Sequence, residues 1–398
     1  MIRGLTLAAC LTAAGLCAQQ NPAAEGHWVG TWGCAPQLTE PANMPPAPGL
    51  SGNTLRQTVR TTIGGKRLRV RFANLFGDGP LTMNAVRLAA SAGGGAIQPG
   101  TGGELLFRGG ATVAIPQGET VVSDVLDYDL APMANVAITI YFGETPAAIT
   151  GHPGSRSTSY LQAGNAIDAT DMGQAAKAVH WYVITGIDVL RTDNAGVVAV
   201  LGDSITDGRG STTDGNDRWT DDLARRLQSN ASTAAISVLN EGLGGNAVLA
   251  GGLGPPAVTR FDRDLFGQSG ARWLIVLEGV NDIGVGKSPT VAADLIAAFG
   301  QLIDKAHAQH LRVYGVPVLP FGRSMYSTLA HEAARQEVNS WIRTSGRFDA
   351  VIDMDAAVRD AGEPANLAAV YDSGDHLHLN PAGYRKMAEV IDLSLFGR

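Results

Sequence analysis

The sequence predicts an all-β sandwich of jelly-roll type over residues 26–190, followed by an α/β part with a parallel sheet over residues 196–398. In the first part, short apolar runs are separated by Gly, Pro and Asn, which is typical of an all-β domain. In the second part, buried apolar runs alternate with stretches of helical periodicity. A chain of 398 residues is long enough to form two domains with a core each.

The N-terminus has the layout of a secretory signal. A basic start at Arg3 is followed by an apolar, alanine-rich stretch that ends in small residues, so we expect a signal peptide over residues 1–18 with cleavage after Ala18. The stretch "LAAC", ending at Cys10, resembles a lipoprotein box, but the apolar run before it is short for a signal. We therefore expect a secreted or periplasmic protein, with lipid anchoring as the less favoured alternative.

Composition argues against several classes of partner. The net charge is −7 and no basic block occurs, which argues against nucleic acid and anionic membrane surfaces. After the signal, no apolar run reaches the roughly 18 residues of a membrane span, so stable membrane insertion is not expected. Cys10 and Cys17 would leave with the signal, and Cys34 alone forms neither an internal disulfide nor a Cys-based metal site.

The predicted sandwich begins with two alternating runs, "TLRQTVRTTI" and "KRLRVRFANLF". Gly64-Gly65 lies between them and predicts a hairpin turn. Further strands are expected within residues 104–110, 111–116, 119–130 and 135–143. Short strands at regular spacing favour an antiparallel sandwich.

This half shows no charged catalytic cluster, but it carries several aromatic residues. Trp28, Trp32, Tyr141 and Trp181 could form a sugar-binding platform. The alternative, aromatic side chains buried in a sandwich core, is the commoner arrangement.

The second part opens with "GVVAVLGDS" (196–204), a continuous apolar run typical of a buried parallel strand. A helical pattern follows at 218–228, another buried strand at 272–282 and another helix at 290–309, and the alternation continues to a closing helix at 382–393. Such alternation predicts a parallel sheet with helices on both faces. Functional residues then collect at the carboxyl ends of the strands.

Ser204, in "LGDSITDG", is a candidate nucleophile. Gly202 lets the chain turn sharply after the strand, which would leave the Ser204 hydroxyl exposed at the edge of the sheet. A serine needs an adjacent base to become nucleophilic. The alternative is an ordinary turn, because Gly, Asp and Ser are all turn formers.

Two further strand ends carry candidate donors to a developing negative charge. In "LNEGLGGNAV", the N–H of Gly245 could face an oxyanion, and in "VLEGVNDIG" the Asn281 side-chain amide could do the same. The alternatives are a glycine-rich loop and a helix cap.

The stretch "YDSGDHLHLNPAGY" holds Asp372, Asp375, His376 and His378. Asp375 and His378 are three residues apart, so the carboxylate can fix the imidazole tautomer and hold the ring toward a serine. A metal site would instead use both histidines and one or both aspartates, but no further His–Asp–Glu cluster completes a shell. We favour the acid–base pair, with Asp372 and His376 shaping the loop.

A helix is expected directly after this stretch. Asn380 followed by Pro381 is typical of an N-cap with proline in the first turn, so His378 would lie on a loop braced by that helix.

Four blocks in this order resemble the SGNH (GDSL) hydrolase superfamily; they are residues 202–204, 240–245, 279–282 and 375–378. The resemblance spans about residues 196–398. With its N-terminal β-domain, the chain is also similar to a bacterial branch of secreted esterases that includes xylan esterases. The resemblance implies a three-layer α/β/α fold with a flavodoxin-like sheet, and no metal or other cofactor.

The resemblance also implies a role for each site residue. Ser204 would be the nucleophile, His378 the general base, and Asp375 the residue that orients the imidazole. The backbone N–H groups of Ser204 and Gly245, with the side chain of Asn281, would form the oxyanion hole. The first block reads "GDSIT", with isoleucine where the family name has leucine, and the two side chains are similar in size.

These observations predict a secreted serine ester hydrolase that removes short acyl groups such as acetate from carbohydrate esters through an acyl-enzyme. The alternatives are a lipase, arylesterase or lysophospholipase with the same chemistry, a non-catalytic carbohydrate-binding protein, and a metal-dependent hydrolase. The expected partner is an acylated carbohydrate or another small ester, and the oligomeric state is left open.

Overall fold

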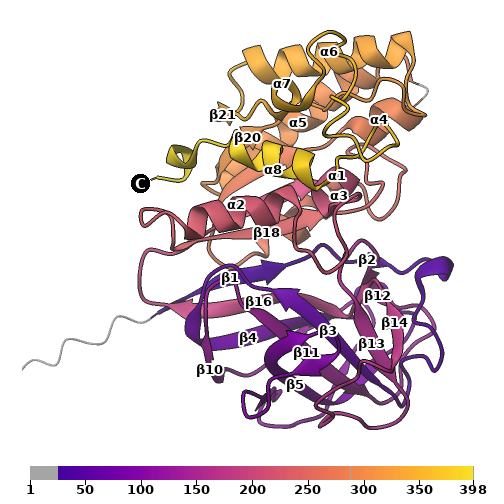
Figure 1. Ribbon diagram of the computed structural model, residues 1–398, viewed down its shortest axis with the longest axis vertical. Coiled ribbons are helices and arrows are strands. Elements are labelled where there is room, and N and C mark those ends of the chain that lie inside the picture. The colour runs from indigo at the N-terminus through magenta and orange to yellow at the C-terminus, as the bar shows by residue number, and fades with distance from the viewer. Residues whose placement is uncertain (1–25, 287, 398) are drawn as a thin grey trace, which may run out of the picture.

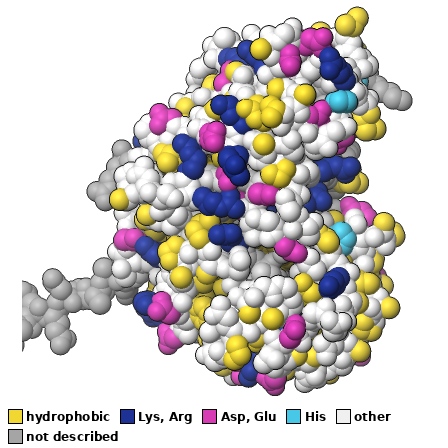
Figure 2. All heavy atoms as spheres, viewed as in Figure 1, with side chains coloured by type: hydrophobic (Ala, Val, Ile, Leu, Met, Phe, Trp, Pro, Cys, Tyr) yellow, Lys and Arg dark blue, Asp and Glu magenta, His cyan; other side chains and the backbone are white. Residues whose placement is uncertain are grey.

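The computed structural model describes residues 26–286 and 288–397. The predicted signal peptide at residues 1–18 lies outside the described residues. Figure 1 shows two halves, with the strands of residues 26–191 below and the sheet and helices of residues 196–397 above. On the face seen in Figure 2, basic side chains gather over the upper half with acidic side chains among them.

The strands of the N-terminal half are β1 (His27–Gly33), β2 (Gln37–Leu38), β3 (Thr54–Arg60), β4 (Gly65–Ala73), β5 (Leu81–Gly93), β6 (Ala96–Ile97), β7 (Gly103–Glu104), β8 (Val113–Ile115), β9 (Thr120–Val122), β10 (Leu126–Leu130), β11 (Asn135–Phe142), β12 (Thr150–His152), β13 (Ser159–Gln162), β14 (Ala176–Ala178), β15 (Trp181–Tyr182) and β16 (Ile184–Arg191). A 3₁₀ turn, η1 (Pro41–Asn43), follows β2.

These strands form three sheets. One has the order β1-β16-β4-β10 with β9 beside β4, the second has the order β14-β13-β3-β11-β5-β6 with β7 and β8 beside β5, and the third is β15-β12-β2. Alternate side chains of β4 enter the core, where Leu68, Val70 and Phe72 are fully buried. The jelly-roll assignment for this half stays a prediction.

The predicted hairpin at Gly64-Gly65 is wrong, because β3 and β4 belong to different sheets. The segment between them crosses from one sheet to the other, with the Thr62 N–H donating to Thr31 O at 2.8 Å. A Cβ at Gly64 would lie 2.3 Å from Leu130 O. The glycine therefore allows a close backbone approach rather than a two-residue turn.

The sequence pattern also missed β5, which has 13 residues and pairs with β11. Its sequence, "LTMNAVRLAASAG", is rich in alanine and contains asparagine and glycine, which are poor strand formers. Tertiary pairing overrides the weak local preference.

The elements of the C-terminal half are β17 (Gly196–Gly202), α1 (Ser204–Asp207), α2 (Trp219–Gln228), β18 (Ile236–Gly242), α3 (Ala257–Phe261), the π-helical turn η2 (Asp262–Phe266), β19 (Ala271–Leu277), α4 (Val280–Val285), α5 (Val291–Ala308), β20 (Arg312–Gly315), α6 (Leu329–Thr344), β21 (Ala350–Val351), α7 (Met354–Val358), α8 (Pro381–Glu389) and the 3₁₀ turn η3 (Leu393–Phe396).

Its strands form one sheet in the order β18-β17-β19-β20-β21, and each neighbouring pair runs parallel. All seven residues of β17 are buried, as a strand in the middle of a sheet that is covered on both faces requires. Helix α2 packs on β18 and α8, and α5 packs on β20 and α6. No helix of the described residues has the length and apolar character needed to cross a bilayer.

The two halves are joined by backbone contacts. The segment after β1 reaches β18, where Cys34 forms a parallel bridge with Asn240. The Gly30 N–H donates to Ser269 O at 2.8 Å, and the Thr62 hydroxyl donates to Val238 O at 3.3 Å. The N-terminal half therefore lies against one edge of the parallel sheet.

The close approach at Gly64 predicts a stability effect. Gly64→Ala should lower the melting temperature by roughly 2 to 6 °C, because the new Cβ must displace the backbone near Leu130. Gly102→Ala is the matched control, since a Cβ there meets nothing closer than 3.8 Å. Equal melting temperatures for the two variants would contradict the crossing geometry.

Candidate active site

Ser204 lies where β17 passes into α1. A Cβ at Gly202 would lie 2.3 Å from Thr206 Cβ, so only glycine permits this close turn. The Asp203 side chain caps α1 by accepting from the Ile205 N–H at 2.9 Å. Ser204 is the first residue of the helix, so its N–H has no partner within it.

The structure brings Ser204, His378 and Asp375 together. The Ser204 Oγ lies 2.7 Å from His378 Nε2, and His378 Nδ1 lies 2.7 Å from Asp375 Oδ2. An ionised carboxylate only accepts, so Nδ1 donates to Asp375 and the neutral ring leaves Nε2 to accept from the serine. This is the arrangement that a serine nucleophile and its base require, although the roles of the three residues stay predictions.

The loop that carries His378 is fixed at both ends. Asp375 Oδ1 accepts from the His378 N–H at 2.8 Å and from the Leu377 N–H at 3.1 Å. Helix α8 begins at Pro381, and the Asn380 side chain accepts from the Gly383 N–H at 3.0 Å. The predicted N-cap is therefore confirmed, and it braces the imidazole from behind.

The surroundings lower the pKa of both partners. Burial lowers the pKa of His378, against the raising effect of Asp375. Partial burial of Asp375 opposes its ionisation, but the N–H groups and imidazole of His378 outweigh this and lower the Asp375 pKa to about 2. Near neutral pH the pair thus holds a carboxylate and an uncharged imidazole.

Asn281, at the start of α4, is held by two hydrogen bonds. Its Nδ2 donates to Asn246 O at 2.7 Å, and its Oδ1 accepts from the Tyr326 hydroxyl at 2.9 Å. An amide nitrogen carries two hydrogens, so one remains to donate elsewhere. Tyr326 belongs to no recognisable motif, so the sequence did not predict its contact with Asn281.

The loop that contains Gly245 is tied to the same helix. Gly245 has φ of +69°, a backbone conformation that glycine adopts readily. Asp282 accepts from the N–H groups of Val248 at 2.8 Å and Leu249 at 2.9 Å. Gly245 and Asn281 line the same cavity as Ser204, so the structure places both predicted donors at the site.

Asp372 and His376 are bonded to each other rather than to the serine. His376 Nδ1 lies 2.5 Å from Asp372 Oδ2, and the His376 N–H donates to Asp372 Oδ1 at 3.0 Å. Within residues 26–286 and 288–397, no group of three or more His, Cys, Asp or Glu side chains is arranged to hold a metal ion. These contacts are consistent with the predicted loop-shaping role.

The cavity over Ser204 has a volume of about 560 Å³. The N-terminal half shows no charged catalytic cluster in its sequence, but it supplies part of the cavity wall. Its contributing side chains are mostly polar or charged; they are Gln37, Glu40, Asn43, Pro153, Arg156 and His180. Gln37, Glu40 and Asn43 lie in one short segment, whereas Arg156 and His180 lie on later loops, so no local pattern groups the wall residues together.

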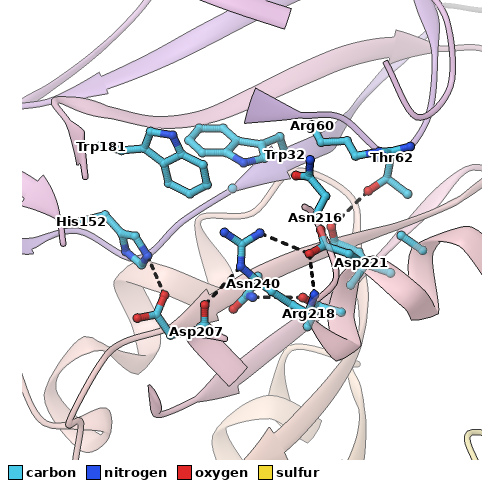
Figure 3. Close-up of a pocket in the computed structure, with 14 residues that line it drawn as sticks. Trp32, Arg60, Thr62, His152, Trp181, Asp207, Asn216, Arg218, Asp221 and Asn240 are labelled. Atoms are coloured by element: carbon cyan, nitrogen blue, oxygen red, sulfur yellow. Dashed lines mark hydrogen bonds and ion pairs between the residues drawn. The ribbon is translucent and has the colours of Figure 1, made fainter. Parts of the chain in front are cut away.

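A smaller cavity lies deeper between the halves, close to α1 (Figure 3). Here His152 Nε2 lies 2.9 Å from Asp207 Oδ1, and His152 Nδ1 lies 2.8 Å from Ala35 O. Trp32 and Trp181 pack edge to face beside them, and each is only 6% exposed. For these two aromatics the structure shows the buried arrangement and not a sugar platform.

Residues 200–386 match the family described as the GDSL-like lipase/acylhydrolase family. No curated protein is similar enough to count as a relative.

Several solved structures are similar to about half of the chain. A member of the lipolytic protein G-D-S-L family from Veillonella parvula is 18% identical, covers 51% of this chain and 97% of its own, and has a TM-score of 0.39. An aryl esterase from M. smegmatis is 18% identical, with coverages of 49% and 95% and a TM-score of 0.38. The acetyl xylan esterase AlAXEase is 18% identical, with coverages of 49% and 96% and a TM-score of 0.37.

The lowered pKa of His378 predicts a pH profile. If the neutral imidazole is the base, kcat/KM for a nitrophenyl ester should rise with pH through the His378 pKa and then stay level. Because burial lowers that pKa, the midpoint should lie below the usual value of about 6.5. A midpoint above 7, or activity that does not change between pH 4 and 8, would contradict this role.

The Tyr326 hydroxyl predicts a second effect. Tyr326→Phe should lower kcat about tenfold with little change in KM, because the Asn281 amide loses the partner that orients it. Tyr128→Phe, in β10 of the other half and outside the cavity lining, is the control. A higher KM with unchanged kcat would show instead that Tyr326 contacts the substrate.

Proposed function

We propose that the GDSL/SGNH hydrolase domain at residues 200–386 is the catalytic part of a secreted serine esterase that removes short acyl groups from carbohydrate esters. The main support for this reaction is geometric. Two contacts of 2.7 Å join Ser204 to His378 and His378 to Asp375, and all three residues line an open cavity. Export rests on the signal predicted at residues 1–18.

The proposed reaction has two steps. Ser204 Oγ transfers its proton to His378 Nε2 and attacks the ester carbonyl, while the Ser204 and Gly245 N–H groups and the Asn281 amide donate to the oxyanion. The protonated imidazole then gives its proton to the leaving alcohol. In the second step, His378 takes a proton from water, which attacks the acyl-enzyme. The protonated imidazole then returns the proton to Ser204 Oγ as the bond to the acyl group breaks and the acid leaves.

The side chains that line the cavity support a sugar ester as the substrate. The residues from the N-terminal half include Gln37, Asn43 and Glu40, and both amides donate to the Glu40 carboxylate, at 2.5 and 2.9 Å. Such groups match the hydroxyls of a carbohydrate better than a long alkyl chain. The acetyl group is proposed because polar and charged side chains outnumber the apolar ones at the cavity, which are Pro153, Leu253, Met325 and Leu377.

A second candidate, an arylesterase or lipase, has one observation in its favour. Leu253 and Met325 border the same cavity and are 52% and 90% exposed. Exposed apolar side chains beside a catalytic cavity suit an aromatic or longer acyl group.

An ester panel decides between the candidates. Wild type and Ser204→Ala should be assayed on acetylated xylan and on nitrophenyl esters of increasing chain length. Under the proposal, acetate release from xylan depends on Ser204, and nitrophenyl acetate is preferred to the longer esters. Activity that increases beyond about eight carbons would favour the lipase, and acetate release that persists in Ser204→Ala would overturn the mechanism.

The neighbouring histidines allow a matched comparison. His378→Ala should lower kcat by roughly 10³-fold or more, because the serine loses its base. His376→Ala should change kcat less than tenfold, since His376 bonds Asp372 in the same loop. A similar loss in both variants would show that the loop, and not the imidazole of His378, limits turnover.

A further inference from the structure

The loop that follows β12 carries Arg156 to the wall of the catalytic cavity. Arg156 has φ of +50°, in the left-handed region that arginine rarely adopts. Backbone strain of this kind persists only where the surroundings impose it, and it is concentrated at functional sites.

Contacts with the C-terminal half impose this conformation. Arg218 donates to Ser155 O, and the Asp214 N–H donates to Arg156 O at 2.8 Å. Two residues later, the Thr158 N–H and hydroxyl both donate to the Asp214 carboxylate at 2.7 Å. The residues just before the loop are fixed as well, by the His152–Asp207 contact in Figure 3.

The Arg156 side chain has unused hydrogen-bonding capacity. Its Nε is shielded from solvent and has no partner among the described residues. A guanidinium carries five donors in a planar fork, and a buried donor without a partner is costly. The shielded Nε is out of reach of an entering ligand, so a substrate would contact the terminal nitrogens of the same fork.

A second cation lies on the same cavity. Arg209 follows α1, its side chain is 63% exposed, and its nearest carboxylate contact is Asp375 Oδ2 at 3.9 Å, an oxygen already bonded to His378. After burial, the charges of Arg209 and Arg156 are further causes that lower the pKa of His378. Both guanidinium groups therefore act within reach of the catalytic imidazole.

The carboxylates of the cavity wall are engaged elsewhere. Glu40 accepts from Gln37 and Asn43, and Asp207 is bonded to His152. Glu40 keeps its negative charge, because its two partners are neutral amides. Among the described residues, however, Arg156 has no ion-pair partner within 4 Å and Arg209 has only the 3.9 Å contact with Asp375, so both guanidinium groups can pair with an added carboxylate.

We infer that Arg156 and Arg209 form a subsite for a carboxylate of the ester substrate, such as that of an acylated uronic acid. The inference rests on the proposed function and narrows its substrate class. A guanidinium fork matches a carboxylate through two parallel hydrogen bonds, which gives both strength and orientation. The subsite holds the charged group beside the Ser204 hydroxyl while the ester enters the oxyanion hole.

Paired esters test the inference. One pair places the charge on the alcohol side (3-acetoxybenzoate and its methyl ester), and the other places it on the acyl side (mono-nitrophenyl succinate and nitrophenyl butyrate). In at least one pair, the ratio of kcat/KM for the charged over the neutral ester should fall roughly tenfold in Arg156→Gln. Arg209→Gln should lower the same ratio, and Arg156→Lys should restore part of it.

Arg108→Gln is the matched control, because Arg108 is an arginine of the same half, has φ of +54° and lies outside the catalytic cavity. The ratio of kcat/KM for the charged over the neutral ester in Arg108→Gln should equal that of the wild type. Ratios in Arg156→Gln that stay at the wild-type value in both pairs would overturn the subsite, even if every ester is hydrolysed through Ser204.

A binding measurement separates this inference from the proposed function. By calorimetry, Ser204→Ala should bind galacturonate with an affinity at least tenfold higher than its affinity for galactose. Adding Arg156→Gln should remove this difference in affinity. Equal affinity for the two sugars would overturn the subsite. Hydrolysis that does not depend on Ser204 would overturn the proposed mechanism, whereas the calorimetric result still decides the subsite.

Discussion

The C-terminal half depends on one buried guanidinium, that of Arg260, which is 1% exposed. It donates to Gly202 O, Glu241 O and Asn246 Oδ1 at 3.1, 2.7 and 2.9 Å. Its two remaining donors reach the carboxylates of Asp264 at 3.1 Å and Glu278 at 3.4 Å, so all five are used. Gly202 and Glu241 lie at the carboxyl ends of β17 and β18, and Glu278 directly follows β19. One side chain thus ties together the ends of three neighbouring strands beneath the candidate active site.

This tie links Ser204 to Asn281, the predicted nucleophile and one of the predicted oxyanion donors. Gly202 lies two residues before Ser204, and Asn246 accepts the hydrogen bond that orients Asn281. Several carboxylates lie close together in the same region. The pKa of Glu278 is raised well above its usual value, mainly by burial and secondly by the charge of Asp203. Removing one member of a buried charge network typically costs about 3–5 kcal/mol, because the partners are left uncompensated. The geometry of the site is therefore maintained by an interaction that contacts no substrate.

The features that sequence reasoning found are local ones. A buried apolar run predicts β17 because every side chain of a central parallel strand must be apolar, and the spacing of Asp375 and His378 suffices for a contact within one loop. The crossing at Gly64 and the wall residue Arg156 depend on chain segments that are distant in the sequence, and neither has a periodic or motif signature. Arg260 was missed for the same reason, since an arginine in a short helix has no pattern that marks it as buried.

The remaining question is why the chain places its N-terminal half against the sheet edge next to α1. A Cβ at Gly154 would lie 1.6 Å from Asp207 Oδ2, so the loop before Arg156 fits the helix of the nucleophile without space for any side chain. Two residues earlier in the chain, the His152–Asp207 contact fixes the same helix. Because one half supplies the reacting groups and the other supplies part of the cavity wall, loop changes in the N-terminal half can alter which esters fit without moving Ser204, His378 or Asp375. The close fit limits such changes to residues that face the cavity, and Arg156 is one of them.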